Sequence, residues 1–156
     1  MLRRLVILLV SAVIAVISTF WLLAAQSQSG QAPGLVDNKL APCPTSPNCV
    51  NSEFPIDNSH FITPLTLSIG QTEAMIKVNE VISQQGGDIT VSEDNYLAAT
   101  FRSDLFGFID DLEIRIDPEQ KQVHLRSAAR VGHSDLGVNK ERAHHLGQLL
   151  TKQLNP

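Results

Sequence analysis

The chain has 156 residues, and its 12 lysine and arginine residues against 16 aspartate and glutamate residues give a formal net charge of −4. Arg3 and Arg4 precede an apolar segment, so everything after that segment carries 10 basic against 16 acidic residues, a net charge of −6. This acidity argues against nucleic acid as a partner and against binding to anionic lipid through bulk charge.

The apolar segment covers residues 5–25, which are uncharged and mostly apolar. At about 1.5 Å per residue, a helix of this length is roughly 31 Å long and matches a hydrocarbon core of roughly 30 Å. We therefore predict a membrane anchor over residues 1–25, with the lipid bilayer as partner of residues 5–25. Positive charge stays in the cytoplasm, so Arg3 and Arg4 place residues 26–156 in the periplasm or an equivalent space.

A cleaved signal peptide is the alternative interpretation of this segment. The apolar stretch of a signal peptide is usually about 7–15 residues long and ends at small residues. Here the stretch is longer, and Leu23 occupies a position of the best cleavage site where a small residue is preferred. These features favour an uncleaved, single-pass anchor.

Residues 26–41 are rich in glutamine, serine and glycine and show no hydrophobic periodicity. This composition predicts a flexible tether. The remaining residues, 42–156, are enough for one domain with a single modest core.

Cys43 and Cys49 are the only cysteines. A disulfide between them closes a short ring that Pro44 and Pro47 already bend, and the closure is worth roughly 2 kcal/mol by chain-entropy reasoning. Such a bond persists outside the cytoplasm. Zinc binding needs four ligands, and a redox motif usually has two residues between its cysteines, so both alternatives are weaker.

Hydrophobic periodicity after the cysteine pair predicts seven elements in the order strand, helix, four strands, helix. These are a strand over 60–67 interrupted by Pro64, a helix over 72–85, strands over 88–92, 96–102, 111–116 and 122–130, and a helix over 139–154. Short connections favour antiparallel pairing. The prediction is an α+β fold, a two-layer sandwich of a mainly antiparallel sheet with the helices on one face.

The strands over 111–116 and 122–130 form the clearest hairpin. Placing their apolar residues on one face fixes the register and puts Asp111 diagonal to Arg126 and Arg130. Cross-strand ion pairs, each worth about 0.2–1 kcal/mol, are the favoured interpretation, and a ligand site using the same charges is the alternative. The predicted facing pairs are Leu112–Ser127, Ile114–Leu125, Ile116–Val123, Glu113–Arg126 and Arg115–His124.

Three segments together resemble the DUF1499 family, a domain of unknown function. They are PCPTSPNCV at 42–50, FGFIDDLE at 106–113 and RSAARVGHSDLGVNKER at 126–142. The resemblance covers about residues 40–152, with one departure at His133, where an aromatic residue such as tyrosine is expected. It implies one folded unit in an extracytoplasmic setting and implies no activity, because none is established for the family.

The segment 132–137 contains serine, histidine and aspartate but does not predict catalysis. Adjacent residues cannot converge as a triad, and Leu136 stands where a nucleophile elbow needs glycine. Ser134 or Asp135 is instead expected to bind turn amides, and Asn139 to cap the last helix. No catalytic residue is predicted.

The free amides at the start of the last helix lie close in sequence to several arginines, which are ingredients of an anion or polar-headgroup site. The candidate ligand-binding residues are Arg126, Arg130, Ser134, Asp135, Asn139 and Arg142, with an acidic edge formed by Asp110, Asp111 and Glu113. The acidic residues do not have the spacing of a calcium loop, and the histidines lack a zinc-binding spacing. Neither a metal site nor a cofactor is predicted.

Two functions remain open. The favoured one is a membrane-anchored binding or assembly module with a membrane or envelope protein as partner. The alternative is a small-ligand carrier or hydrolase-like enzyme with a pocket near Arg126, Arg130 and Ser134. A cavity under the last helix would favour the alternative, whereas arginines held by carboxylates would favour the first function or a purely structural role.

Overall fold

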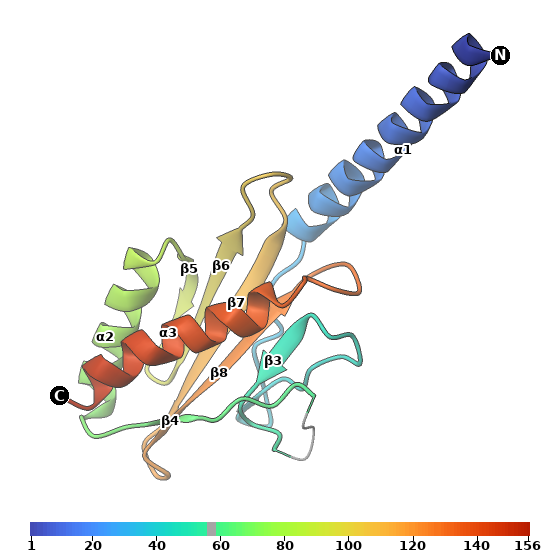
Figure 1. The fold of residues 1–156 in the computed structure, drawn as a ribbon. Coiled ribbons are helices and arrows are strands. Elements are labelled where there is room, and N and C mark those ends of the chain that lie inside the picture. The colour runs from blue at the N-terminus through green and yellow to red at the C-terminus, as the bar shows by residue number, and fades with distance from the viewer. Residues whose placement is uncertain (56–58) are drawn as a thin grey trace.

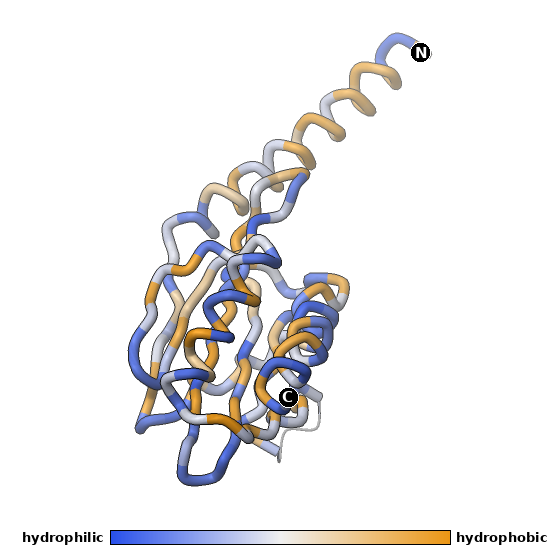
Figure 2. Tube along the Cα trace, turned by 90° about the vertical axis from the view of Figure 1, so that its left-hand side faces the viewer, coloured by the Kyte–Doolittle hydropathy of each residue, from blue (hydrophilic) through white to orange (hydrophobic). Residues whose placement is uncertain are grey.

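The computed structural model describes residues 1–55 and 59–156, and Figure 1 shows one long helix standing away from an α+β domain. This helix, α1 (Leu2–Gln28), confirms the predicted apolar helix and extends it to Gln28. Among the described residues it is the one helix long and apolar enough to cross a membrane, by length and composition. Its apolar side chains are mostly exposed, and the hydropathy colouring of Figure 2 marks hydrophobic positions along most of the helix.

The domain is built on an antiparallel sheet covered on one face by two helices, which confirms the predicted α+β fold (Figure 1). The strand order is β3 (Cys49–Asn51), β8 (Gln122–Ala129), β7 (Ile109–Asp117), β6 (Tyr96–Arg102) and β5 (Asp88–Ser92), with β4 (Leu65–Thr66) also paired to β8. The covering helices are α2 (Gln71–Gln84) and α3 (Val138–Leu154), and a separate hairpin joins β1 (Leu35–Val36) to β2 (Lys39–Leu40).

The main core lies between the sheet and the two helices. Alternate residues of β7 and β8 point toward the helices, as the period of two along a strand requires. Completely or almost completely buried residues of this core include Leu112, Ile114, Ile116, Val123 and Leu125 of the sheet, Val78 and Ile82 of α2, and Leu146 and Leu150 of α3.

The register of the central hairpin is as predicted at all five facing pairs. Asp117 helps to close the turn, because its Oδ1 accepts hydrogen bonds from the backbone N–H groups of Glu119 (3.1 Å) and Gln120 (2.9 Å). Asp111 faces Ala128, so it lies diagonal to Arg126 and Arg130 as expected. The apolar parity of the two strands was enough to determine this pairing.

The edge strand near the start of the domain differs from the prediction. The predicted strand over 60–67 is reduced to β4 at Leu65–Thr66, because Pro64 cannot donate a backbone hydrogen bond to a neighbouring strand. On this edge of β8 the longer of the two pairing strands is β3, at Cys49–Asn51, which the sequence did not indicate.

The segment over 26–41, for which composition indicates a flexible tether, packs on the sheet face opposite α2 and α3. Leu40 is completely buried in a small apolar cluster with Tyr96 and Ala98. The backbone N–H of Gly34 donates to Glu113 Oε1 at 3.0 Å. This segment therefore covers polar groups of the sheet, a role for which no hydrophobic periodicity is required.

Candidate functional site

Ion pairs link β7 and β8 on the sheet face opposite the helices. Arg126 Nη1 donates to Glu113 Oε2 at 2.8 Å. Arg130 donates two hydrogen bonds to the Asp111 carboxylate, from Nε to Oδ2 at 2.9 Å and from Nη2 to Oδ1 at 2.7 Å. The predicted carboxylate–guanidinium pairing is confirmed, and paired arginines in this geometry hold the sheet together.

Glu113 is the most enclosed acid of this face, with no exposed surface. Tyr96 Oη donates to its Oε1 at 2.8 Å, the Gly34 amide donates to the same oxygen, and Arg126 occupies the other oxygen. Burial raises the pKa of Glu113, while Arg126 and Tyr96 oppose that shift. Both oxygens of this carboxylate accept hydrogen bonds from within the protein.

A second buried charge cluster surrounds Arg115. Its Nε donates to Glu53 Oε1 at 2.6 Å, and its Nη2 lies 3.2 Å from Asp117 Oδ2. His124 is buried beside this cluster, with Nδ1 at 3.2 Å from Ser52 Oγ. Sequence reasoning paired Arg115 with His124 but missed Glu53, because nothing in its local sequence indicates a partner on a distant strand.

A separate polar network lies on the helix-covered side of the sheet. Arg142 of α3 pairs with Asp110 at 3.0 Å and donates to Asn139 Oδ1 at 2.8 Å. Ser127 Oγ donates to the same Asn139 oxygen at 2.6 Å. Burial raises the pKa of Asp110, and Arg142 opposes that shift. This network attaches the start of α3 to the end of the hairpin.

The candidate ligand residues consequently do not form one pocket. Arg126 and Arg130 lie on one face of the sheet, whereas Arg142 and Asn139 lie over the other. The acidic edge is divided in the same way, since consecutive residues of a strand point to opposite faces. Asp111 and Glu113 face the segment over 26–41, and Asp110 faces α3.

The start of α3 is capped by Asp135 rather than by Asn139, which corrects the predicted cap. Gly137 occupies the N-cap position with φ of 86°, a conformation that favours glycine. Asp135 accepts hydrogen bonds from the backbone N–H groups of Gly137 (3.0 Å) and Asn139 (2.7 Å). These bonds lower the pKa of Asp135 even though burial acts against them. The protein's own carboxylate thus occupies the anion position at this helix terminus.

The predicted disulfide between Cys43 and Cys49 is present, with an S–S distance of 2.01 Å. Its loop presents Asn48, whose side-chain Nδ2 donates to the carbonyl of Gly132 at 2.9 Å. The Asn48 carbonyl in turn accepts from the Ala129 amide at 3.0 Å. The bridged loop therefore supports the connection that leads from β8 into α3.

The end of α1 is fixed to the domain by direct contacts. Ala24 and Ser27 are completely buried. Ser27 Oγ accepts from the Ile109 amide at 3.0 Å, and the Ser27 carbonyl accepts from Arg130 Nη1 at 3.1 Å. Arg130 therefore joins the hairpin to α1 in addition to pairing with Asp111.

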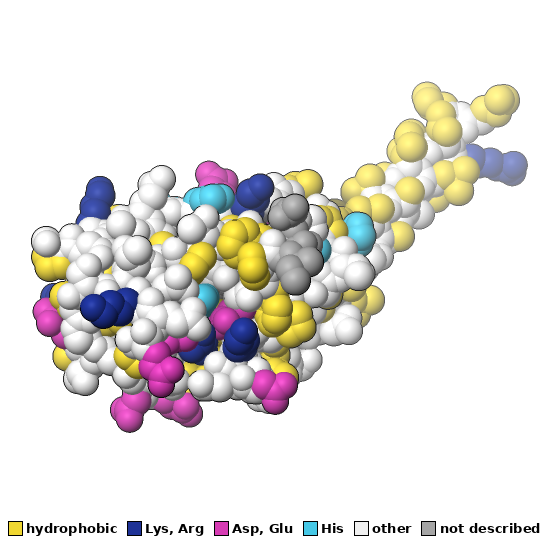
Figure 3. Space-filling view, turned by 90° about the horizontal axis from the view of Figure 1, so that it is seen from below, with side chains coloured by type: hydrophobic (Ala, Val, Ile, Leu, Met, Phe, Trp, Pro, Cys, Tyr) yellow, Lys and Arg dark blue, Asp and Glu magenta, His cyan; other side chains and the backbone are white. Residues whose placement is uncertain are grey.

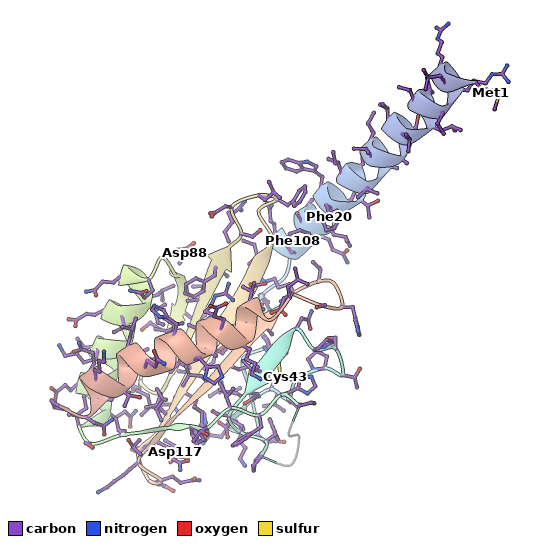
Figure 4. The ribbon with its side chains drawn as sticks, in the orientation of Figure 1. Met1, Phe20, Cys43, Asp88, Phe108 and Asp117 are labelled. Carbon is purple, nitrogen blue, oxygen red and sulfur yellow. A yellow bond between two sulfur atoms is a disulfide. The ribbon has the colours of Figure 1, made fainter. Side chains whose placement is uncertain are left out.

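A cavity of about 240 Å³ lies where α1 meets the domain. Figure 4 shows two of its lining residues, Phe20 of α1 and Phe108 of the β6–β7 connection, close to each other at this junction. The wall is mainly apolar, and Ser134, Asp135 and Asp110 add polar groups. The other apolar lining residues include Leu23, Ile109, Val131 and Val138.

A second cavity, of about 260 Å³, lies beside α3 between Leu65 and Gly147. None of the candidate ligand residues lines it. Among the residues that the structure describes, no group of three or more histidine, cysteine, aspartate or glutamate side chains is placed to hold a metal ion. Of the predicted site residues, Asp110, Ser134 and Asp135 line the cavity at the end of α1. Arg130 lines another cavity, of about 370 Å³, together with Gln28 and Gly30.

Comparison with known proteins locates the shared part of the chain. The family model described as "Protein of unknown function (DUF1499)" matches residues 39–150. The chain belongs to the DUF1499 family. A comparison with curated proteins finds no match.

The DUF1499 match includes the charged side chains of all three networks, the disulfide loop and the two connections that line the cavity at α1. Phe20 and Leu23, which close this cavity, precede the DUF1499 segment. The site therefore combines the family domain with the apolar helix of this chain.

Proposed function

We propose that this DUF1499 protein is a single-pass membrane protein whose domain lies outside the cytoplasm and binds an amphipathic molecule at the membrane surface. The observation that carries the proposal is the cavity of about 240 Å³ between α1 and the domain. One wall belongs to a helix of membrane-spanning length, so a ligand there can reach the cavity from the lipid phase.

The polar groups of the cavity indicate the kind of head group. Ser134 Oγ accepts from the Leu136 amide at 3.2 Å, which leaves its hydroxyl hydrogen available for a ligand acceptor. Asp110 and Asp135 add two carboxylates, and Arg142 pairs with one of them. This balance favours an uncharged or zwitterionic head group over an anionic one.

The volume indicates how much of the ligand fits. Pockets that enclose a whole drug-sized molecule usually measure about 300–1,000 Å³. A cavity of about 240 Å³ therefore takes only part of an amphipathic molecule, and the remainder lies in the bilayer. Partial enclosure of this kind suits a binding module better than an enzyme.

The test fills the cavity with a larger side chain. Val138→Trp places an indole in the wall, and Val36→Trp makes the same change on the distant β1–β2 hairpin, where the valine is exposed to a similar extent. Full-length protein is purified from phosphatidylcholine-containing membranes in mild detergent and weighed by native mass spectrometry. The unchanged chain and Val36→Trp should retain a bound lipid, and Val138→Trp should lose it several-fold. Equal retention in all three proteins would contradict the proposal.

A further inference from the structure

We infer that the domain contacts the outer leaflet through two loops, residues 103–108 and 131–137, whose exposed side chains Leu105 and Leu136 enter the lipid. We call these loops the membrane-facing loops. The inference rests on α1 spanning the bilayer, which is part of the proposed function, and does not depend on any ligand in the cavity.

The depth of the first loop follows from its contacts with α1. Phe106 stacks on Phe20 with ring centroids 5.2 Å apart and meets Trp21 edge-on at 6.2 Å. Phe20 lies five residues before Ala25, the end of the apolar run, which is about 7 Å along a helix axis. When residues 5–25 fill the hydrocarbon core, Phe106 therefore lies within the outer part of that core, beside Phe20.

The domain has no free linker that would let it move away from this depth. Ala24 belongs to the apolar run and yet is completely buried by the domain. The hydrogen bonds of Ser27 to Ile109 and Arg130 fix the following turn of α1. This end of the domain is thus held against the last residues of the apolar run, in the outer leaflet.

The second loop lies at the same level. The cavity at the end of α1 brings Phe20 and Leu23 together with Gly132 and Ser134. Figure 1 shows the two loops on either side of α1, level with each other along the helix axis. A bilayer crossed by α1 would therefore meet both loops.

Each of the two loops carries one strongly exposed leucine. Leu105 is 79% exposed and Leu136 is 96% exposed. A single exposed leucine is ordinary on a protein surface, but here both lie in loops at the end of the domain that adjoins the helix. The face seen from below in Figure 3 carries acidic and basic side chains as well as hydrophobic ones.

The contact is apolar rather than electrostatic. Asp104 adjoins Leu105, and Asp135 adjoins Leu136, so neither leucine is followed or preceded by a charge that would attract anionic lipid. Insertion should consequently occur in vesicles of pure phosphatidylcholine and should persist at high salt, where an electrostatic contact would weaken.

The experiment measures lipid contact at each loop in the full-length chain. Both cysteines are held in the disulfide, so Leu105→Cys or Leu136→Cys supplies a single thiol for a small fluorophore under non-reducing conditions. Glu119→Cys, in the β7–β8 turn, is the matched exposed control. Each protein is reconstituted in phosphatidylcholine vesicles, and quenching by lipids spin-labelled near the head group is compared. Trp21, the only tryptophan, reports insertion of α1 in the same samples.

Quenching at positions 105 and 136 several-fold stronger than at position 119, together with quenching of Trp21, is the expected result. The inference would be overturned if Trp21 were quenched but the labels at positions 105 and 136 were quenched no more than the label at position 119. That result would leave the ligand proposal standing. Loop labels shielded from both lipid and aqueous quenchers would indicate a protein partner and also overturn it. Unquenched Trp21 would remove the premise of both proposals.

Discussion

At the scale of single residues, the charged side chains of this domain act mainly on one another. Arg126 and Glu113 are buried together, and Arg130 holds Asp111. Removing one partner of a buried pair is far more costly than removing an exposed pair, because the remaining charge stays in a medium of low polarity. The stability of the domain should therefore depend on these arginines far more than on surface lysines.

Arg126→Ala should lower the free energy of unfolding by about 3–5 kcal/mol, because it leaves the buried Glu113 carboxylate without its cation. Thermal unfolding of the purified protein measures the change. The control is Lys77→Ala, which removes the exposed Lys77–Glu80 pair and should cost at most about 0.5 kcal/mol. Similar melting temperatures for the two variants would refute the structural role of Arg126.

His124 should make the domain less stable in mild acid. The Leu125 amide donates to Ser52 Oγ at 3.0 Å, so the Ser52 hydroxyl is free to donate to His124 Nδ1. Burial lowers the pKa of His124, with Glu53 opposing the shift and Arg115 supporting it. The unfolded chain then binds a proton near pH 6.5 that the folded chain does not bind.

The free energy of unfolding should consequently fall as the pH drops below about 6.5. In His124→Asn this decline should be shallower between about pH 6.5 and pH 5, because the group that gains the proton on unfolding is gone. Denaturant titrations at several pH values measure the slope. His144→Asn, at an exposed position, should keep the slope of the unchanged protein. Parallel slopes for all three proteins would exclude His124 as the cause.

At the scale of elements, the helices and strands that could be predicted are those whose apolar residues repeat with a regular period. The hairpin register, both domain helices and the apolar helix were predictable, because residues such as Ile114 and Leu125 repeat with the period of their element. The packing at the start of the domain was not predictable, because Leu40 is one buried residue in a polar segment that has no hydrophobic periodicity. The candidate site was assembled from residues close in sequence, such as Arg130 and Arg142, which the sheet then separates.

Leu40→Ala tests whether the segment over 26–41 belongs to the folded unit. Leu40 is completely buried, so its truncation should cost about 2–5 kcal/mol. Val36→Ala, in the same hairpin but at an exposed position, should cost little. Chemical denaturation of the two variants measures the difference. If the segment were a free tether, neither substitution would change the free energy of unfolding, and that result would contradict the packing described above.

At the scale of the whole molecule, the chain combines a helix of membrane-spanning length with a disulfide-bonded domain. Both features are consistent with a domain outside the cytoplasm, since disulfides persist in oxidising compartments. The basic residues Arg3 and Arg4 agree with a cytoplasmic N-terminus.

A reporter fused after Pro156 should be active only outside the cytoplasm, and alkaline extraction should leave the full-length protein in the membrane fraction. Alkylation without reductant should label neither Cys43 nor Cys49, whereas reduction should expose both thiols. Moving Arg3 and Arg4 to the other end of the apolar run should lower the exported fraction. Activity of the reporter in the cytoplasm would contradict the proposed topology.

The direct junction between α1 and the sheet also determines the rotational orientation of the domain about the helix axis. Since Ser27 is bonded to both Ile109 and Arg130, the helix and the domain turn together. Each residue inserted in an α-helix adds about 1.5 Å of height and about 100° of rotation. A one-residue insertion in α1 would thus turn a different side of the domain toward a given neighbour in the membrane. The orientation of the domain about the helix axis is therefore determined by the part of the helix inside the bilayer.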